Sequence, residues 1–166
     1  MPQGAAVVGI TKKLFLSFHK LLARFAHKFA ILISMGTPKV IIVEDDHFLS
    51  SVLKTRLEKE GFLVLQAFDG DEGLAMVRKE KPDVVLLDLI MPKVSGFEVL
   101  EGISSDPELS TIPVMIASNL GQDSDIEKAK SLGAHDYYVK VRTSIDDLAQ
   151  MVKNLVESHH DGSEAN

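Results

Sequence analysis

The chain has 166 residues, of which 45% are hydrophobic and 25% charged, which is typical of one soluble globular domain with a short addition. It contains no cysteine, which excludes disulfides, thiol nucleophiles and metal sites built on thiolates. The net charge of -6 is divided unevenly, because residues 1–36 hold five of the 18 basic residues and none of the 24 acidic ones. The two parts therefore carry about +5 and -11, and the acidic balance of the second argues against non-specific nucleic-acid binding.

The first predicted element is a basic amphipathic helix in residues 11–34. On a helix its polar side chains form one stripe and its apolar side chains the opposite face; the polar ones are Lys13, Ser17, Lys20, Arg24 and Lys28. Interior cations argue against a membrane-spanning helix, and no cleavage pattern indicates a secretory signal. Three interpretations stay open: an anchor on a membrane surface or partner, a helix packed on its own domain, or an extension upstream of a start at Met35.

From Lys39 onward, short apolar runs typical of buried parallel strands alternate with amphipathic stretches typical of helices. The predicted strands are residues 40–43, 62–67, 83–88, 112–117 and 137–140. The predicted helices are residues 48–61, 69–80, 97–104, 124–133 and 144–157. Gly61 and Gly133 are expected to end helices, Asp69 to cap one, and Ser124 with Glu127 to form a capping box.

Five strand-then-helix units predict a parallel sheet with helices on both faces. Right-handed crossovers and one reversal of winding favour an α/β fold of the flavodoxin-like, doubly wound type, with strand order 2-1-3-4-5. The predicted organisation is a basic N-terminal extension at 1–36, which holds the extra amphipathic helix, one domain at 37–158 and a disordered polar tail at 159–166.

Acidic residues follow two of these strands. Glu44 and Asp45 come after the first strand and Asp88 ends the third, and in this topology both strand ends meet at the crevice where ligands bind. Three close carboxylates raise one another's pKa unless a positive group lies among them. Mg²⁺, a hard cation that prefers oxygen ligands, is the cofactor we expect there.

The fourth and fifth strands bring a hydroxyl, Ser118, and an ammonium, Lys140, to the same edge of the sheet. Carboxylate, metal, hydroxyl and ammonium together fit phosphoryl transfer. Asp88 is expected to attack phosphorus, while the metal and Lys140 neutralise the phosphoryl oxygens and Ser118 hydrogen-bonds one of them. The expected product is an acyl phosphate on Asp88.

These residues resemble the receiver domain of response regulators in two-component signalling, over about residues 38–157. The resemblance rests on Val-Glu-Asp-Asp at 43–46, Asp-Leu-Ile-Met-Pro at 88–92 with Gly96, Ser118, and Gly-Ala-His-Asp-Tyr-Tyr-Val-Lys at 133–140. It is similar to a stand-alone receiver of the chemotaxis-regulator type, because few residues follow the last helix. The implied role is a phosphorylation-dependent signalling switch rather than an enzyme.

The resemblance also implies a role for each site residue. Asp88 is the phosphoacceptor, Asp45 binds the metal directly, Glu44 acts mainly through water, and the carbonyl of Ile90 completes the metal site. Ser118 and Tyr137 match a hydroxyl and aromatic switch pair: on phosphorylation Ser118 moves inward, Tyr137 rotates into the space left, and the surface of the last two helices and the fifth strand changes.

The implied partners are a sensor histidine kinase or phosphotransfer protein and a downstream protein target, without nucleic acid. We expect a cytoplasmic protein, peripheral at the membrane if residues 11–34 bind its surface. Two rivals stay open: a pseudo-receiver that binds partners without phosphorylation, and an aspartyl-nucleophile phosphatase. The phosphatase pattern wants an aspartate two residues after the nucleophile, where this chain has Ile90.

One departure from the family pattern concerns Lys140. The family usually has proline next, with a cis bond, whereas Val141 follows here. A cis bond before a residue other than proline costs about 3 kcal/mol, so we expect a trans bond and a shifted loop.

Ile90 and Leu120 flank the expected path of an attacking water, which predicts slow hydrolysis of the acyl phosphate. Asp46 is expected to cap the first helix of the domain.

Overall fold

The computed structural model describes residues 36–162, with side chains as far as His159. The predicted helix in residues 11–34 and residues 163–166 lie outside the described part. The described elements are β1 (Lys39–Val43), α2 (His47–Lys59), β2 (Leu63–Ala67), α3 (Gly70–Glu80), β3 (Val84–Leu87), α4 (Gly96–Ser104), β4 (Val114–Ser118), α5 (Asp123–Ser131), β5 (Asp136–Val139), the 3-10 helix η1 (Lys140–Arg142) and α6 (Ile145–Gly162).

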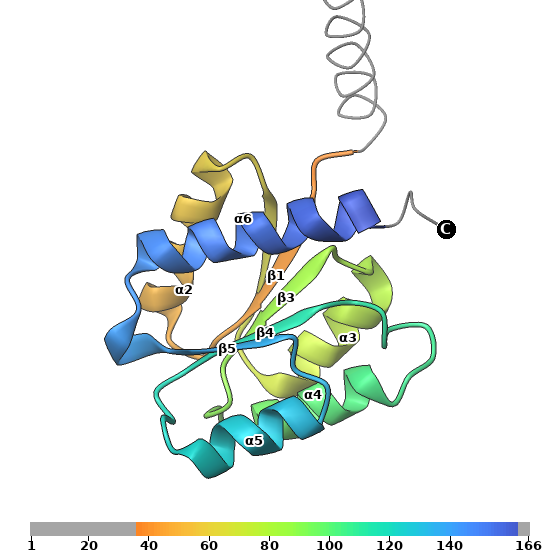
Figure 1. The fold of residues 1–166 in the computed structure, drawn as a ribbon, viewed down its shortest axis with the longest axis vertical. Helices are drawn as coiled ribbons and strands as arrows, with labels where there is room; N and C mark the ends of the chain where they lie inside the picture. The colour runs from red at the N-terminus through yellow and green to blue at the C-terminus, as the bar shows by residue number, and fades with distance from the viewer. Residues whose placement is uncertain (1–35, 163–166) are drawn as a thin grey trace, which may run out of the picture. The chain divides into compact units, whose positions relative to one another are not determined.

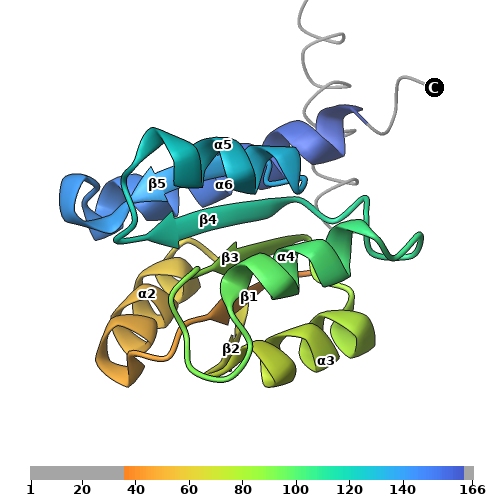
Figure 2. The same cartoon turned by 90° about the horizontal axis from the view of Figure 1, so that it is seen from below.

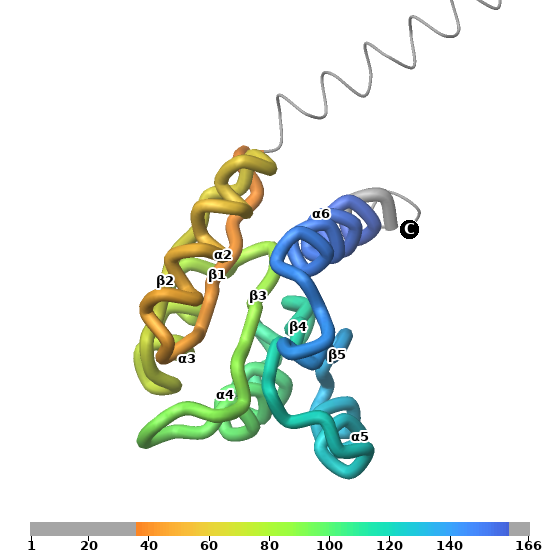
Figure 3. Tube along the Cα trace, turned by 90° about the vertical axis from the view of Figure 1, so that its left-hand side faces the viewer, coloured from red at the N-terminus to blue at the C-terminus, as the bar shows by residue number. Residues whose placement is uncertain are grey.

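The strands form one parallel sheet of order β2-β1-β3-β4-β5, which confirms the predicted topology. Helices α2 and α6 cover one face and α3, α4 and α5 cover the other (Figure 1). Figure 2 shows the same strand order from β5 to β2, and in Figure 3 β3 runs through the middle, between the β1 and β2 half and the β4 and β5 half. The strand that Asp88 follows, β3, is thus the central one.

Side chains alternate between two hydrophobic cores along the inner strands, because successive residues of a strand point to opposite faces. In β1, Val40 and Ile42 pack with the α2 and α6 side, whereas Ile41 and Val43 pack with the side of α3, α4 and α5. All three inner strands are buried almost throughout. The edge strands β2 and β5 are only partly buried, since each has a neighbour on one side only.

Most predicted helix ends are confirmed. Asp46 caps α2 by accepting hydrogen bonds from the backbone N–H groups of Phe48 at 2.9 Å and Leu49 at 3.0 Å. Asp69 caps α3 by accepting from the N–H of Glu72 at 2.9 Å. The chain leaves α2 and α5 through Gly61 at φ 93° and Gly133 at φ 97°, a region that favours glycine.

The predicted capping box at Ser124 is wrong. The N–H groups of Asp125 and Ile126 already donate to the carbonyl of Gln122, so Gln122 is the N-cap, without a side-chain cap, and Ser124 lies inside the first turn. A capping box that we did not predict opens α4 instead: the Ser95 hydroxyl accepts from the N–H of Glu98, and the Glu98 carboxylate accepts from the N–H of Ser95.

The last helix is longer than predicted. It continues to Gly162, so residues 159–162 are helical rather than part of a disordered tail. Neither proline nor an earlier glycine interrupts its backbone after residue 145, so nothing in the local sequence ends it sooner. No helix within residues 36–162 is both long enough and apolar enough to cross a membrane.

Candidate functional site

Strand register brings the three acidic residues together. Val43 and Leu87 are partners in the β1–β3 ladder, and the N–H of Asp88 donates to the carbonyl of Val43 at 2.9 Å. Glu44 and Asp88 therefore leave neighbouring strands at the same level. One carboxylate oxygen from each of Glu44, Asp45 and Asp88 lies within 4.8 Å of the other two. Glu44 and Asp88 are buried and Asp45 is exposed, so the cluster is open on one side.

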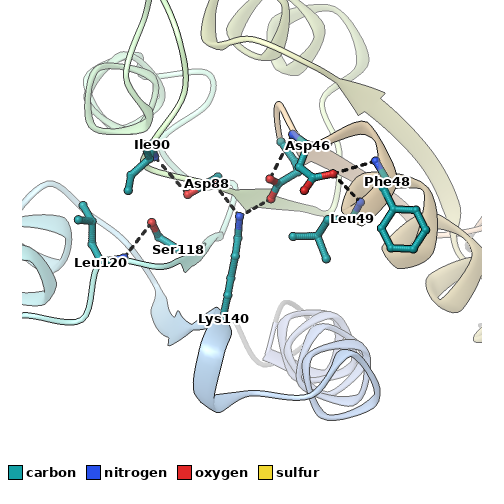
Figure 4. A network of polar contacts seen from close by, with 9 residues as sticks. Asp46, Phe48, Leu49, Asp88, Ile90, Ser118, Leu120 and Lys140 are labelled. Carbon is teal, nitrogen blue, oxygen red and sulfur yellow. Dashed lines mark hydrogen bonds and ion pairs between the residues drawn. The ribbon is translucent and has the colours of Figure 1, made fainter.

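Lys140 lies between two of these carboxylates. Its Nζ donates to Oε2 of Glu44 at 2.5 Å and to Oδ2 of Asp88 at 2.6 Å (Figure 4). The side chains of the three residues are 13%, 4% and 7% exposed. No cis peptide bond occurs within residues 36–162, as expected for a bond before Val141. The loop nevertheless directs Lys140 into the site, although β5 ends at Val139 and Lys140 opens η1.

Burial and charge act together on the titration of this cluster. Burial raises the pKa of Glu44 above its usual value, Lys140 opposes this effect, and the charge of Asp88 adds to it. Burial alone would lower the pKa of Lys140, but its hydrogen bonds to Asp88 and Glu44 and their charges raise it overall. The ammonium is therefore the positive group that offsets the repulsion between the acidic residues.

Ser118 and Tyr137 are connected through one residue of the β4–α5 loop. Ser118 is fully buried at the end of β4, and its Oγ accepts from the N–H of Leu120 at 3.4 Å. The hydroxyl of Tyr137 donates to the carbonyl of Leu120 at 2.9 Å, and burial raises the pKa of Tyr137. Figure 4 shows Ser118 beside Asp88 and Leu120 on the far side of Ser118. The backbone of Leu120 thus contacts both side chains that the sequence pairs as a switch.

The loop after β3 holds Asp88 from the other side. The N–H of Ile90 donates to Oδ1 of Asp88 at 3.1 Å, while the Ile90 side chain is 52% exposed. The N–H of Gly96 donates to the carbonyl of Leu89 at 3.1 Å. A side chain at Gly96 would place its Cβ 2.0 Å from the Asp88 carbonyl oxygen, so only glycine allows the loop to return this closely.

Two neighbouring features lie outside the cluster. Asp46 caps α2, and its own N–H donates to Oε1 of Glu44 at 3.4 Å, so it supports the acidic loop from the helix side. His47 is exposed and stacks on Phe68 with ring centroids 4.0 Å apart.

The contribution of Leu120 to the contacts of Ser118 and Tyr137 had no signal in the sequence, because it comes from backbone groups that every residue type carries.

The fold and this cluster define a flavodoxin-like α/β domain with acidic residues after β1 and β3 and a lysine after the edge strand β5. The chain belongs to the response regulator receiver domain family, whose model matches residues 40–153. Aspartate phosphorylation and Mg²⁺ binding at an acidic pocket are typical of this family, whose members act as switches in two-component systems. Receiver domains interact with histidine kinases or phosphotransfer proteins and with downstream targets.

The chain is 41% identical over 102 residues to protein PilH of Pseudomonas aeruginosa. The aligned segment covers 61% of the chain and 84% of PilH. The chain is 38% identical over 103 residues to the DNA-binding dual master transcriptional regulator RpaA of a Synechocystis strain, covering 62% of the chain. The match spans only 43% of RpaA.

Solved structures agree with this assignment. The receiver domain of the Francisella response regulator 1452 is 30% identical, with a TM-score of 0.68 over 74% of this chain and 98% of that one. The phosphorylated cyanobacterial phytochrome response regulator RcpA is 33% identical, with a TM-score of 0.64 over 74% of this chain and 93% of RcpA. The Mn²⁺-bound form of response regulator Rcp1 is 28% identical, with a TM-score of 0.62 over 71% of this chain and 91% of Rcp1.

Proposed function

We propose that residues 37–158 form a phosphorylation switch in which Asp88 accepts a phosphoryl group from a phosphohistidine of a sensor histidine kinase or phosphotransfer protein. The observation that carries this proposal is the buried position of Asp88, 7% exposed and ion-paired with Lys140, beside two further carboxylates. Such a cluster supplies a nucleophile and a cation for the phosphoryl oxygens in one place. The phosphorylated form of RcpA and the family assignment support it.

The acidic cluster fits a hard divalent cation by its chemistry, since all of its side-chain donors are carboxylate oxygens. Asp45, Asp88 and the carbonyl of Ile90 would hold Mg²⁺ directly, and Glu44 would hold it through water. When bound, Mg²⁺ would neutralise charge that develops on the phosphoryl oxygens. The existence of a Mn²⁺-bound form of the similar regulator Rcp1 supports the binding of a divalent cation.

In the proposed transfer, an Oδ of Asp88 attacks phosphorus while the phosphorus–nitrogen bond of the donor breaks and its electron pair returns to the imidazole. Lys140, now 2.6 Å from Asp88, would pair with a phosphoryl oxygen. The hydroxyl of Ser118 would donate to another. The negative charge on the phosphoryl oxygens is greatest in the transition state of the transfer. Donors fixed close to these oxygens would therefore accelerate phosphoryl transfer.

The switch would use the Leu120 backbone. When the Ser118 hydroxyl turns to the phosphoryl group, it no longer accepts from the N–H of Leu120, so the loop is free to shift. Because Tyr137 holds the carbonyl of the same residue at 2.9 Å, that shift would change the position of its ring. The surface formed by α5, β5 and α6 would change with it, and a downstream protein would bind that surface.

Intact-mass measurement tests the phosphoacceptor. The full chain incubated with Mg²⁺ and acetyl phosphate should gain the mass of one phosphoryl group, and Asp88→Asn should gain none. Asp71→Asn, which alters an exposed aspartate on α3, is the matched control and should be phosphorylated normally. A wild-type chain that never gains the phosphoryl mass would favour the pseudo-receiver. Equal labelling of Asp88→Asn would move the acceptor to another residue.

Tyrosine fluorescence tests the switch, because the chain has two tyrosines and no tryptophan. Tyr138→Phe leaves Tyr137 as the single reporter. Adding beryllofluoride with Mg²⁺ should change its emission, and adding Asp88→Asn to this variant should abolish the change. An unchanged signal in a chain that is phosphorylated would contradict the proposed movement of Tyr137.

The lifetime of the acyl phosphate tests the apolar surroundings. Ile90 and Leu120 lie on the same side of Asp88 in Figure 4, opposite Lys140, and neither side chain can orient a water molecule. We expect the phosphorylated chain to persist for much longer than seconds. Ile90→Asn, which offers an amide to an attacking water, should shorten the lifetime several-fold. A lifetime of seconds in the wild-type chain would contradict this expectation.

A further inference from the structure

Two exposed histidines meet at the end of β5 that lies away from Asp88. His135 directly precedes β5, and His159 lies in the last turn of α6. Their ring centroids are 5.5 Å apart, and the ring planes are inclined at 62°. Lys140, which contacts Asp88, follows the opposite end of β5, more than roughly 10 Å along the strand from His135. The histidine pair is therefore separate from the acidic site.

The backbone of each histidine is held in place, whereas its imidazole nitrogens are available. The N–H of His135 donates to the carbonyl of Val114 at 2.8 Å, which holds its backbone against β4. His159 lies one helical turn after Leu155, whose side chain is buried in the core. Within residues 36–159, neither imidazole takes part in a hydrogen bond or an ion pair. Both rings can thus offer a nitrogen to a ligand.

We propose that His135 and His159 together bind one transition-metal ion such as Zn²⁺, which clamps the end of α6 to the start of β5. An ion held at about 2 Å by one nitrogen from each of two imidazoles, in tetrahedral geometry, separates the ring centroids by about 5 Å. The observed separation of 5.5 Å is close to this value. Small rotations of the two exposed side chains would direct one nitrogen of each ring at the same ion.

The ligand type distinguishes this site from the acidic one. Imidazole suits Zn²⁺, Cu²⁺ and Ni²⁺, whereas Mg²⁺ prefers oxygen ligands. In the described part of the chain, Glu44, Asp45 and Asp88 are the one group of three or more acidic or histidine side chains close enough to share an ion. Water would therefore complete the coordination at the histidine pair. The two sites differ in the metal that they select, and neither depends on the other.

A groove beside the pair gives the ion access and a nearby negative charge. It has a volume of about 350 Å³, lies between β5 and α6, and has His135, Asp136 and Ser158 in its lining. The Asp136 carboxylate accepts from the hydroxyl of Tyr138 at 2.5 Å, and no cation pairs with it within residues 36–159. This charge, on the residue next to His135, favours a cation in the groove.

A metal at this position would act on the surface formed by α5, β5 and α6. One ligand precedes the edge strand β5 and the other belongs to the last turn of α6, so the ion would restrain the end of that helix against the sheet. The restraint would not require phosphorylation of Asp88. It would provide a second input to the surface that phosphorylation is proposed to change.

Calorimetric titration with Zn²⁺ tests the site. Excess Mg²⁺ is included to occupy the acidic cluster, and under this condition the full chain should bind one Zn²⁺. His135→Ala and His159→Ala should each weaken that binding by at least roughly tenfold, because even the loss of a group that orients a metal ligand costs this much. His47→Ala removes another exposed histidine and should bind as the wild type does. Absence of binding by the wild type, or a loss in only one pair variant, would overturn the shared site.

Hydrogen exchange tests the clamp, because it reports on an element that the substitution does not touch. Zn²⁺ should slow amide exchange several-fold in residues 155–159 of the wild type but not in His135→Ala. Unchanged exchange in wild type that has bound Zn²⁺ would overturn the clamp. Both pair variants should still gain the phosphoryl mass with Mg²⁺ and acetyl phosphate. Loss of that gain would contradict the independence of the two sites.

Discussion

The structure has two charge networks whose bond lengths are alike and whose surroundings differ. Between α2 and α6, Arg56 pairs with Glu60 at 2.6 Å and with Asp146 at 2.5 Å, and Lys153 pairs with Glu60 at 3.0 Å. In the acidic site, Lys140 pairs with Glu44 and Asp88 at 2.5 and 2.6 Å. The side chains of the first network are 19–80% exposed, whereas those of the second are 4–13% exposed.

Exposure, not distance, decides what each network contributes. Water solvates the charges between α2 and α6 in both the paired and the unpaired state, so each pair adds little to stability. Water is largely excluded from the charges around Lys140, so removal of one partner leaves the others without compensation. The buried network is therefore the one that can couple protein stability to the binding of a metal or a phosphoryl group.

Removal of the central cation of the buried network should have the largest effect. Lys140→Met should lower the free energy of unfolding of the metal-free chain by about 3 kcal/mol, because two buried carboxylates lose their counter-charge. Urea denaturation measures this, and saturating Mg²⁺ should recover much of the loss. Lys153→Met is the matched change in the exposed network and should cost far less. Equal losses in the two variants would contradict the comparison.

Asp46 marks the boundary of the buried network. It belongs to the same acidic run as Glu44 and Asp45 but caps α2, so Asp46→Ala should lower the free energy of unfolding by about 1 kcal/mol. Its affinity for Mg²⁺ should stay close to that of the wild type. Asp45→Ala should show the reverse pattern, with weakened Mg²⁺ binding and little change in stability. Urea denaturation and calorimetry of both variants, in parallel, measure the two effects.

Removal of the central cation of the exposed network should have a smaller effect that depends on salt. Arg56→Met removes both the pair with Glu60 and the pair with Asp146. Its difference in stability from the wild type should shrink as NaCl is raised from low to about 1 M, because salt screens exposed charges. The effect of Lys140→Met should change much less in the same series. A loss in Arg56→Met that is independent of salt would indicate packing rather than charge.

The smallest effect we expect concerns pH. Hydrogen bonds from Arg56 and Lys153 hold the pKa of Glu60 below its usual value of 4.5. The folded state thus favours the ionised carboxylate, which stabilises the protein at neutral pH and ceases to do so as pH falls through the folded-state pKa. Wild type should be slightly more stable than Glu60→Gln at pH 7, and the difference should shrink as pH falls below 4.5 and vanish below the folded-state pKa. Urea midpoints across this range measure it.

The sequence by itself determined the five strands, their order and the residue at the tip of the central strand. Continuous apolar runs, helix stops at Gly61 and Gly133, and the cap at Asp46 are local signals, and few parallel topologies satisfy them. The same reasoning brought Glu44, Asp45 and Asp88 to one edge, because the carboxyl ends of parallel strands meet there. It failed at α5, where Ser124 fits a capping pattern but the backbone begins to wind at Gln122.

Only the tertiary structure decided how the gathered groups meet. The direction of the Lys140 side chain depends on the register of β5 against β4 and on the turn that follows β5. The presence of Val141 in place of proline was therefore not enough to predict whether Lys140 contacts Asp88. The burial of Glu44, the exposure of Asp45 and the place of Leu120 between Ser118 and Tyr137 also require the folded chain. Local patterns specify which groups are delivered to an edge, but packing and water exclusion specify which of them touch and which remain open to a ligand.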